Sequence, residues 1–386
     1  VSLNDSYVRN MRLYKYLKYY ISTVTLILGI IIFPIVPNGP VTFLLGFSLF
    51  IILGDYILKK DEKVYKYKYQ IFLDLPTYLN LPLLLLFMVL SVSYITEYQN
   101  IYVAQIIENY LYLDITALRA NVSTLGKVSL VILSSLFIGI MGTVPAHELT
   151  HRKHNKFDMF VGNWLLAFSW DCAFAIEHVY GHHKNIGLLN DPATAKRGEG
   201  LYGFIMRAII KEQVDAWQIE ISRLKRQKLK FISFKNRMLT GYAKSFVITG
   251  LIYFISSFTG LTIFLTISLL SKFLLESINY IEHYGLIRVP GQPVRPAHSW
   301  NSNHYLSSIY LCNVTRHSAH HEKSNLKYWE LQPYENAPKT PFGYLSVLYL
   351  TIFFPYLYRR IMEKKLTDWD LNFANSEELK IIKNIQ

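Results

Sequence analysis

The sequence predicts an all-α integral membrane protein with about six transmembrane helices and a histidine-rich cap on the cytoplasmic side. Of its 386 residues, 51% are hydrophobic. They are concentrated in stretches of about 18 residues that carry almost no charge, which is the length that crosses a bilayer as a helix. Nine of the twelve histidines stand at the ends of such stretches or just beyond them. The apolar stretches therefore predict the spans, and the histidines predict where the chemistry lies.

The apolar stretches set the expected order of elements along the chain. The expected spans are residues 19–36, 41–58, 79–95, 128–144, 245–258 and 261–280, with Thr259 and Gly260 between the last two. The first stretch has the length of a span and lacks a small-residue cleavage site, so we expect it to stay in the protein. The predicted parts are an N-terminal segment with four spans (1–144), a cytoplasmic insert (145–244), two spans (245–281) and a C-terminal cytoplasmic cap (282–386).

Basic residues predict the orientation of the spans. Lys and Arg gather before the first span and after the second one, at Arg9, Arg12, Lys15 and Lys18 and at Lys59, Lys60, Lys63, Lys66 and Lys68. Loops rich in Lys and Arg stay on the cytoplasmic side. Counted from there, the span ends that carry His147 and His283 both face the cytoplasm.

The formal net charge of +13 raises the question of nucleic acid as a partner. Tyrosines alternate with lysines at residues 14–16 and 65–69, but both stretches flank spans, where such residues anchor a protein at the lipid headgroups. We therefore expect membrane lipids and no nucleic acid as partners. The basic segment from Lys211 to Arg237 is either a solvated or lipid-facing helix or a docking surface for an acidic electron carrier.

The two cysteines, Cys172 and Cys312, form no paired metal-binding motif. The chain therefore has no sequence basis for a zinc ribbon, a rubredoxin module or an iron–sulfur cluster of its own. A redox reaction in this protein would have to receive its electrons from another protein.

Nine histidines form four clusters whose spacing predicts a metal site. They are His147 and His151; His178, His182 and His183; His283; and His317, His320 and His321. Imidazole is the commonest protein ligand for iron, copper and zinc. Nine such ligands exceed what one ion can use, so the pattern predicts two metal ions.

The spacing within each cluster indicates which imidazoles share a metal. His147 and His151 lie four residues apart, on one helix face. Alone, this pair matches the HExxH motif of zinc peptidases, which need one further protein ligand. We expect His178 and His182 to form a second such pair, with His183 projecting toward a different metal or position. The last cluster repeats the three- and four-residue spacings, and His283 reaches the site from the end of the last span.

Acidic residues stand next to nearly every cluster, at Glu148, Glu177, Asp191 and Glu282. A metal-bound imidazole usually donates its second N–H to a carboxylate or carbonyl, so we expect these acids to orient the histidines. Direct ligation, helix capping and, for Asp191, a turn remain open. Outside the clusters, His154 is expected in solvent, and His298 and His304 are candidates for the pocket.

These motifs resemble those of a known family. The segments HELTHR (147–152), EHVYGHH (177–183), NYIEHYG (279–285) and RHSAHH (316–321) resemble the four histidine motifs of the integral-membrane alkane hydroxylases, as does NDPATAKRGE (190–199). Three histidine boxes also fit membrane fatty-acid desaturases, sterol oxidases and xylene monooxygenases. The EHYG element is the feature that favours the alkane hydroxylases over these families. The chain departs from the family at Val314 and Thr315, before the last box, and at Arg152 and Lys153, after the first.

The resemblance implies an alkane 1-monooxygenase on the cytoplasmic side of a bacterial inner membrane. It implies two non-haem iron ions held by the nine clustered histidines, with O2 as co-substrate. It also implies conversion of a medium- or long-chain n-alkane from the bilayer to a 1-alkanol, and electrons from rubredoxin and rubredoxin reductase. A membrane fatty-acyl desaturase or hydroxylase, a zinc membrane metallopeptidase and a non-enzymatic haem or metal carrier are the alternatives.

Overall fold

The structure is a computed structural model that describes residues 13–36, 38–97 and 100–385. Within these ranges the chain is helix, turn and loop, and its β-type contact is an isolated bridge between Asn301 and Lys339. The predicted all-α class is confirmed. Arg9 and Arg12 of the basic N-terminal segment lie outside the described residues.

The helices up to the first histidine motif form most of the membrane bundle. They are η1 (Lys18–Tyr20), α2 (Ile21–Ile35), α3 (Gly39–Ile57), α4 (Ile71–Ile95), α5 (Ile101–Leu111), α6 (Ile115–Ala120), α7 (Thr124–Phe137), η2 (Ile138–Thr143) and α8 (Val144–His151). The last three run as one continuous helix from Thr124 to His151. This helix carries the first histidine motif out of the apolar bundle.

The remaining helices form most of the cap and the last spans. They are α9 (Lys156–Ala167), α10 (Phe174–Glu177), η3 (His178–His182), α11 (His183–Asn185), α12 (Leu201–Arg226), α13 (Arg237–His283), η4 (Pro296–His298), α14 (Tyr305–Tyr310), α15 (His317–Glu322), α16 (Tyr344–Phe353), α17 (Pro355–Asn372) and α18 (Ser376–Ile385). Short helices thus carry the second and last histidine motifs.

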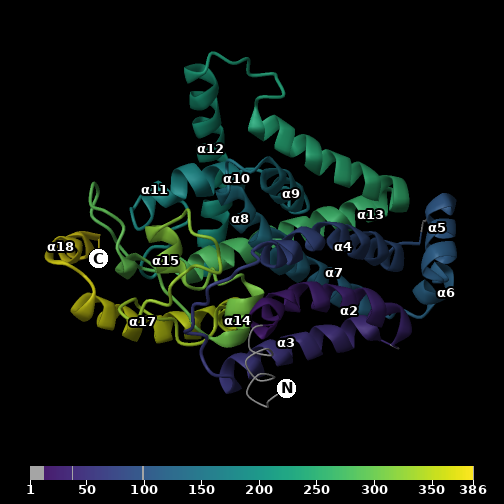
Figure 1. Ribbon diagram of the computed structural model, residues 1–386, viewed down its shortest axis with the longest axis horizontal. Helices are drawn as coiled ribbons and strands as arrows, with labels where there is room; N and C mark the ends of the chain where they lie inside the picture. The colour runs from purple at the N-terminus through teal and green to yellow at the C-terminus, as the bar shows by residue number, and fades with distance from the viewer. Residues whose placement is uncertain (1–12, 37, 98–99, 386) are drawn as a thin grey trace.

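Five helices among the described residues are long and apolar enough to cross a membrane: Leu13–Ile35, Gly39–Ile57, Ile71–Ile95, Thr124–His151 and Arg237–His283. The fifth has 47 residues and would measure about 70 Å if straight. It bends instead, and Figure 1 shows its two arms running in opposite directions. These arms are the last two predicted spans, so the chain is a multi-pass membrane protein.

The bend of α13 lies a few residues before the predicted turn at Thr259 and Gly260. Ser256 and Ser257 leave the helical conformation, and Ser257 has a positive φ of 55°. Gly260 packs directly on Ser256, because a β-carbon at position 260 would lie 2.2 Å from the Ser256 β-carbon. The turn therefore needs glycine at 260, whereas the residues that depart from helical geometry are Ser256 and Ser257.

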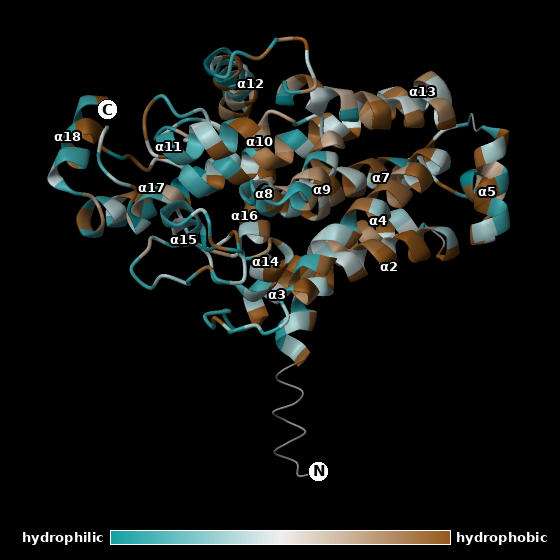
Figure 2. Cartoon of the chain, turned by 45° about the horizontal axis from the view of Figure 1, so that its top comes forward, coloured by the Kyte–Doolittle hydropathy of each residue, from teal (hydrophilic) through white to brown (hydrophobic). Residues whose placement is uncertain are grey.

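Aromatic rings fill the centre of the bundle. Phe87 of α4 and Phe137 of α7 have ring centroids 4.9 Å apart, and Phe33 of α2 lies 5.4 Å from Phe87. Burial of such side chains contributes about 1.5–3 kcal/mol each. Figure 2 shows hydrophobic residues concentrated in α2, α4, α7 and α13, and hydrophilic residues in α11, α15, α17 and α18. The molecule therefore has an apolar end and a polar end.

Buried hydrogen bonds and an ion pair join the last histidine motif to the loop after α3. Arg316, the residue before the last histidine motif, is 1% exposed. Its guanidinium donates to the carbonyls of Leu331 and Asp61, each at 2.7 Å. The Asp61 carboxylate pairs with Lys18 at 2.6 Å. The loop after α3 thereby holds the short histidine helix α15 in place.

Candidate metal centre

The first histidine motif projects from the end of a membrane helix. His147 and His151 both belong to α8, and their ring centroids lie 4.9 Å apart. Directly before α8, the backbone forms a π-helical turn, η2, in which the Val144 N–H donates to the Gly139 carbonyl five residues earlier. Such π-turns are frequent at functional sites. The predicted sharing of one helix face by His147 and His151 is confirmed.

The second motif is arranged differently from the prediction. Its backbone forms another π-helical turn, η3, and the His183 N–H donates to the His178 carbonyl. Residues five apart, rather than four apart, therefore lie on one face. His178 groups with His183, and His182 points to the other histidine group. The expected pairing of His178 with His182 is wrong because an α-helical spacing was assumed.

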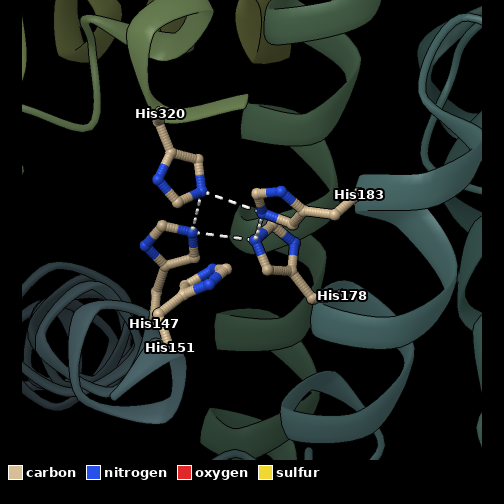
Figure 3. A group of neighbouring side chains, drawn as sticks. All are labelled: His147, His151, His178, His183 and His320. Atoms are coloured by element: carbon tan, nitrogen blue, oxygen red, sulfur yellow. Dashed lines mark hydrogen bonds between the residues drawn. The ribbon is translucent and has the colours of Figure 1, made fainter. Parts of the chain in front are cut away.

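The first histidine group contains His147, His151, His178, His183 and His320. Figure 3 shows four of these rings joined in a circuit of close Nε2 contacts, with His151 beside it. Around the circuit, the Nε2 atoms are separated by 2.8 Å (His147–His178), 3.1 Å (His178–His183), 3.0 Å (His183–His320) and 3.0 Å (His320–His147). The His151 Nε2 is buried and has no hydrogen-bond partner.

The size of this circuit fits a metal ion. A planar square with sides of about 3.0 Å places its centre about 2.1 Å from each corner, which matches a metal–imidazole bond. The four Nε2–Nε2 contacts cannot all be full hydrogen bonds, because each donating Nε2 has one hydrogen for its two neighbours. A cation at the centre would accept a lone pair from every ring, including the unpartnered Nε2 of His151.

The second group contains His182, His283, His317 and His321, and all four are buried. The His317 Nε2 lies 3.1 Å from that of His283 and 2.8 Å from that of His321. The His182 Nε2 is buried without a partner, and its ring centroid lies 4.7 Å from that of His283. This group fits a second metal by the same reasoning.

The two groups are adjacent. The rings of His183 and His321, one from each group, have centroids 4.4 Å apart. Neighbouring residues of the same short helices supply both groups, as with His182 and His183 or with His320 and His321. The arrangement can therefore hold a dinuclear centre.

Several imidazoles are held in the neutral form that binds metal. Burial lowers the pKa of His178, His183, His317, His320 and His321 well below the usual histidine value, and neighbouring imidazoles lower it further. A ring with a lowered pKa stays neutral at pH about 7 and keeps a lone pair for a metal. The site is therefore a set of ligands ready for a cation.

In two of the rings, those of His182 and His317, the Nδ1 atom contacts an oxygen of a residue outside the histidine groups. His182 Nδ1 lies 2.9 Å from Asp191 Oδ2, and His317 Nδ1 lies 3.2 Å from the Val314 carbonyl. If each Nδ1 carries the proton, the Nε2 lone pair faces the group. Thr194 donates to the same Asp191 oxygen at 2.6 Å. Sequence reasoning did not single out Thr194, although it lies within the NDPATAKRGE segment.

The other acidic candidates differ in their contacts. Glu282 Oε2 lies 3.3 Å from His317 Nε2, on the side that faces the second group. Glu148 accepts from Arg152 at 2.8 Å, and the same guanidinium pairs with Asp74. Glu177 is buried, and its Oε1 has no hydrogen-bond partner. Glu282 alone of these three thus has a contact with one of the clustered imidazoles.

The three remaining histidines lie outside both groups. His154 is exposed, as predicted. His298 is buried against the carboxylate of Glu378 at 2.8 Å, which connects it to α18. His304 Nδ1 lies 2.9 Å from the Ser302 hydroxyl, and its side chain lines an apolar hollow between α3 and α16.

Sequence reasoning missed a buried arginine that supports the second motif. Arg288 donates to the carbonyls of Ile186 and Lys184, each at 2.7 Å. These bonds join the end of the second motif to the segment after His283. A lone arginine in a loop carries no spacing signal, so the contact becomes visible only in the folded chain.

The sequence is similar to those of several known proteins. Alkane 1-monooxygenase 2 from Alcanivorax borkumensis is 33% identical over 247 residues, which cover 63% of this chain and 64% of the relative. Alkane 1-monooxygenase from Pseudomonas putida is 34% identical over 285 residues, or 71% of this chain and 68% of the relative. The xylene/toluene monooxygenase hydroxylase component XylM, also from Pseudomonas putida, is 28% identical over 368 residues, or 95% and 93%.

The first relatives are thus covered over slightly less than two thirds of their length. The family model described as fatty acid desaturase matches residues 125–351, from α7 to α16. That range contains all nine histidines of the two groups. This chain therefore belongs to the fatty acid desaturase family.

Proposed function

We propose that this protein is a membrane non-haem di-iron monooxygenase that inserts one oxygen atom from O2 into a terminal C–H bond of a medium- or long-chain n-alkane. The product is a 1-alkanol. The observation that carries the proposal is the pair of adjacent all-histidine groups at the polar end of the membrane bundle. Relatives named alkane 1-monooxygenase, about one third identical, support the choice of reaction.

Under this proposal the nine histidines hold two iron ions. The five of the first group bind one ion, and the four of the second group bind the other. Iron bound there supplies O2 activation and the oxidation of an unactivated C–H bond. Asp191 orients His182, Glu282 stands beside His317, and Glu148 and Glu177 support the helices that carry the first two motifs. Burial of the rings excludes water from the reacting groups.

The reaction needs an outside electron source. It consumes the alkane, O2, two electrons and two protons and yields the alkanol and water. Cys172 and Cys312 are both buried and unpaired, so neither forms a redox disulfide. We propose a rubredoxin-type carrier, reduced by its reductase, as the donor.

A basic surface next to the second motif suits such a carrier. Tyr180 lies between His178 and His182 in η3 and is 41% exposed. Lys153 and Arg237 lie over its ring, with distances to the centroid of 4.4 Å and 5.0 Å. Arg223 and Arg226 of α12 line a surface hollow together with Tyr180 and Arg237. We name these five residues the Tyr180 patch and propose it as the docking surface for the acidic carrier.

The membrane supplies the substrate. Each CH2 of an alkane favours an apolar environment by about 0.8 kcal/mol, so the alkane is concentrated in the bilayer, next to the spans. We propose that the histidine end faces the cytoplasm of a bacterial inner membrane, as the basic loops indicate. The division into residues 1–144, 145–244, 245–281 and 282–386 is part of the same proposal.

The test is metal analysis of the purified chain together with an O2-dependent assay on alkanes. We expect about two iron atoms per chain, by the two-group geometry, and a 1-alkanol whose oxygen derives from labelled O2. One zinc per chain with activity independent of O2 would instead indicate a metallopeptidase. A strong Soret band would indicate haem.

A second candidate reaction is hydroxylation of a methyl group on an aromatic ring. The relative named as a xylene/toluene monooxygenase component matches 95% of this chain, a larger share than the alkane 1-monooxygenases match. Parallel assays with an n-alkane and with xylene separate the two, because the preferred substrate gives the higher kcat/KM. A fatty-acyl desaturase would form an alkene and incorporate no oxygen.

A further inference from the structure

A second cluster of ionisable groups lies behind the second histidine motif, outside both histidine groups. It consists of one lysine and four carboxylates, each less than a tenth exposed: Lys272, Asp171, Glu177, Glu212 and Glu276. Three parts of the chain supply them, namely the segment leading into and through α10, helix α12 and helix α13. We name this set the acid cluster.

Lys272 lies in the middle of the acid cluster. Its Nζ is 2.7 Å from Asp171 Oδ1 and 3.8 Å from one oxygen each of Glu212 and Glu276. Asn279 donates to the other Glu276 oxygen at 3.1 Å. The carboxyl groups of Glu212 and Glu276 are therefore neighbours, because each has an oxygen beside the same ammonium. Asp171 Oδ2, Glu177 Oε1 and Glu276 Oε1 are buried and have no hydrogen-bond partner.

The charges of the acid cluster do not balance if every group is ionised. Four carboxylates and one ammonium leave a net charge of −3, and a buried charge without a partner is costly. Burial raises the pKa of Glu212 well above the usual range, and the negative charge of Glu276 raises it further. Two neighbouring buried carboxyl groups do not both ionise readily, which favours a proton held between them.

A third metal ion is not the better explanation. Among the described residues, the groups of donor atoms that all lie within 4.8 Å of one another are the two histidine groups. Oxygens of Asp171, Glu212 and Glu276 lie around the Lys272 ammonium instead. Protons bound to the carboxyl groups therefore supply the missing positive charge.

Residues of the acid cluster are neighbours along the chain of both the clustered histidines and surface residues of α12. Glu177 directly precedes His178, and Glu276 lies seven residues before His283, which is about 10 Å along a helix. On the other side, Lys211 of α12 is exposed and Asp215 is partly exposed. Ionisable residues at the end of a membrane span often mark a proton path.

We propose that Glu212 and Glu276 share one buried proton and that this pair supplies protons to the metal centre during turnover. The supply role rests on the proposed monooxygenase reaction, which consumes two protons for each O2. Glu212 gives its carboxyl proton toward the centre, becomes a carboxylate beside Lys272, and regains a proton from solvent at the surface of α12.

The proton affinity of the pair depends on all the groups that face it. Asp171, Glu177 and Asp191 are acidic neighbours, Lys272 is the buried cation, and Lys211 and Asp215 lie on the surface of α12. Cys172, Tyr242 and Lys244 flank Asp171 and Lys272 on the far side. Replacement of Glu212 or Glu276 leaves these groups in place and removes the contact that shares the proton.

Infrared spectroscopy of the purified, metal-loaded protein in lipid nanodiscs tests the shared proton without any turnover. We expect the C=O stretch of a protonated carboxylic acid to persist at pH values above the usual glutamic acid pKa. The band should disappear in Glu212→Gln and in Glu276→Gln. Glu220→Gln is the matched control on the same helix, because the Glu220 carboxylate is ionised between Arg223 and Arg237.

Kinetics tests the supply role. In Glu212→Gln we expect kcat to fall about tenfold or more, since loss of a proton donor has this size of effect. Metal content and the KM for alkane should remain unchanged, and the solvent deuterium effect on kcat should rise. Glu212→Asp keeps a carboxyl group and should recover part of kcat, which a purely structural role for Glu212 would not produce.

The outcomes separate this inference from the proposed function. A wild-type band with no alkanol formed would refute the alkane substrate and support the shared proton. Alkanol formation by a wild-type protein without the band would overturn the shared proton and leave the hydroxylase in place. Unchanged kcat and solvent isotope effect in both Gln variants would overturn the supply role.

Discussion

The backbone N–H of His183 donates to the carbonyl of His178, five residues earlier. This single π-type bond places the two imidazoles in the same group and turns His182 toward the other one. An ordinary α-turn would have paired His178 with His182. The local backbone of the second motif therefore decides how nine ligands divide into five and four.

Removal of one ring from the first group should abolish turnover with the fold retained. His320→Ala and His183→Ala each open one corner of the circuit of Nε2 contacts, in which both neighbours lie 3.0–3.1 Å away. We expect no detectable alkanol and a loss of about one metal ion per chain, with unchanged circular dichroism. His154→Ala, an exposed control, should retain activity. Activity like the wild type in either first-group variant would contradict the ligand assignment.

Asp191 should control the metal affinity of the second group. Asp191→Ala removes the oxygen 2.9 Å from His182 Nδ1. Loss of such a partner typically weakens metal binding by about 10–100-fold, and we expect the second ion to be lost first during titration with a chelator. Asn190→Ala, at the exposed neighbouring residue, is the control. Equal metal retention in the two variants would show that Asp191 does not orient the ring.

Gly181 should be essential for the π-turn. A β-carbon at position 181 would lie 2.5 Å from Glu177 Oε1 and 3.1 Å from its Cδ. Gly181→Ala must therefore shift the carboxylate or the turn, and overpacking of this kind costs about 1–3 kcal/mol. We expect a lower melting temperature and weaker metal binding.

The matched control for Gly181 is Gly203→Ala in α12, where a β-carbon would meet nothing within 4 Å. Alanine there should raise stability by about 0.5–1 kcal/mol, since it is the better helix former. Equal melting temperatures for the two variants would argue against a steric role for Gly181.

Electron transfer from a carrier protein should depend on salt if the Tyr180 patch is the docking surface. The kcat/KM for an acidic rubredoxin should fall as ionic strength rises, because surface charges are screened over a Debye length of about 8–10 Å. Arg226→Glu should lower it further at low salt and leave the KM for alkane unchanged. Lys383→Glu, on α18, is the control. Rates that do not change with salt would remove the patch from the proposal.

The sequence alone was sufficient for the class of fold and the set of histidines. Charge-free stretches of span length predict membrane helices directly, because the bilayer thickness sets the helix length. All five long helices found lie at predicted spans, and the two arms of α13 account for the last two. The four histidine clusters were visible because their spacing is short, and the structure brings all nine together.

Only the tertiary structure decided how these residues are divided and supported. In the π-turn at His178–His182, Gly181 packs closely against Glu177, a contact that a linear pattern does not reveal. The contact of Lys272 with Asp171 joins residues about 100 positions apart, as do the bonds from Arg288 to the second motif. Local spacing determines which residues share a helix face. Contacts between distant parts of the chain determine which of these faces meet. The sequence therefore specified the clustered histidines and the spans, and folding specified the two groups and the buried acids behind them.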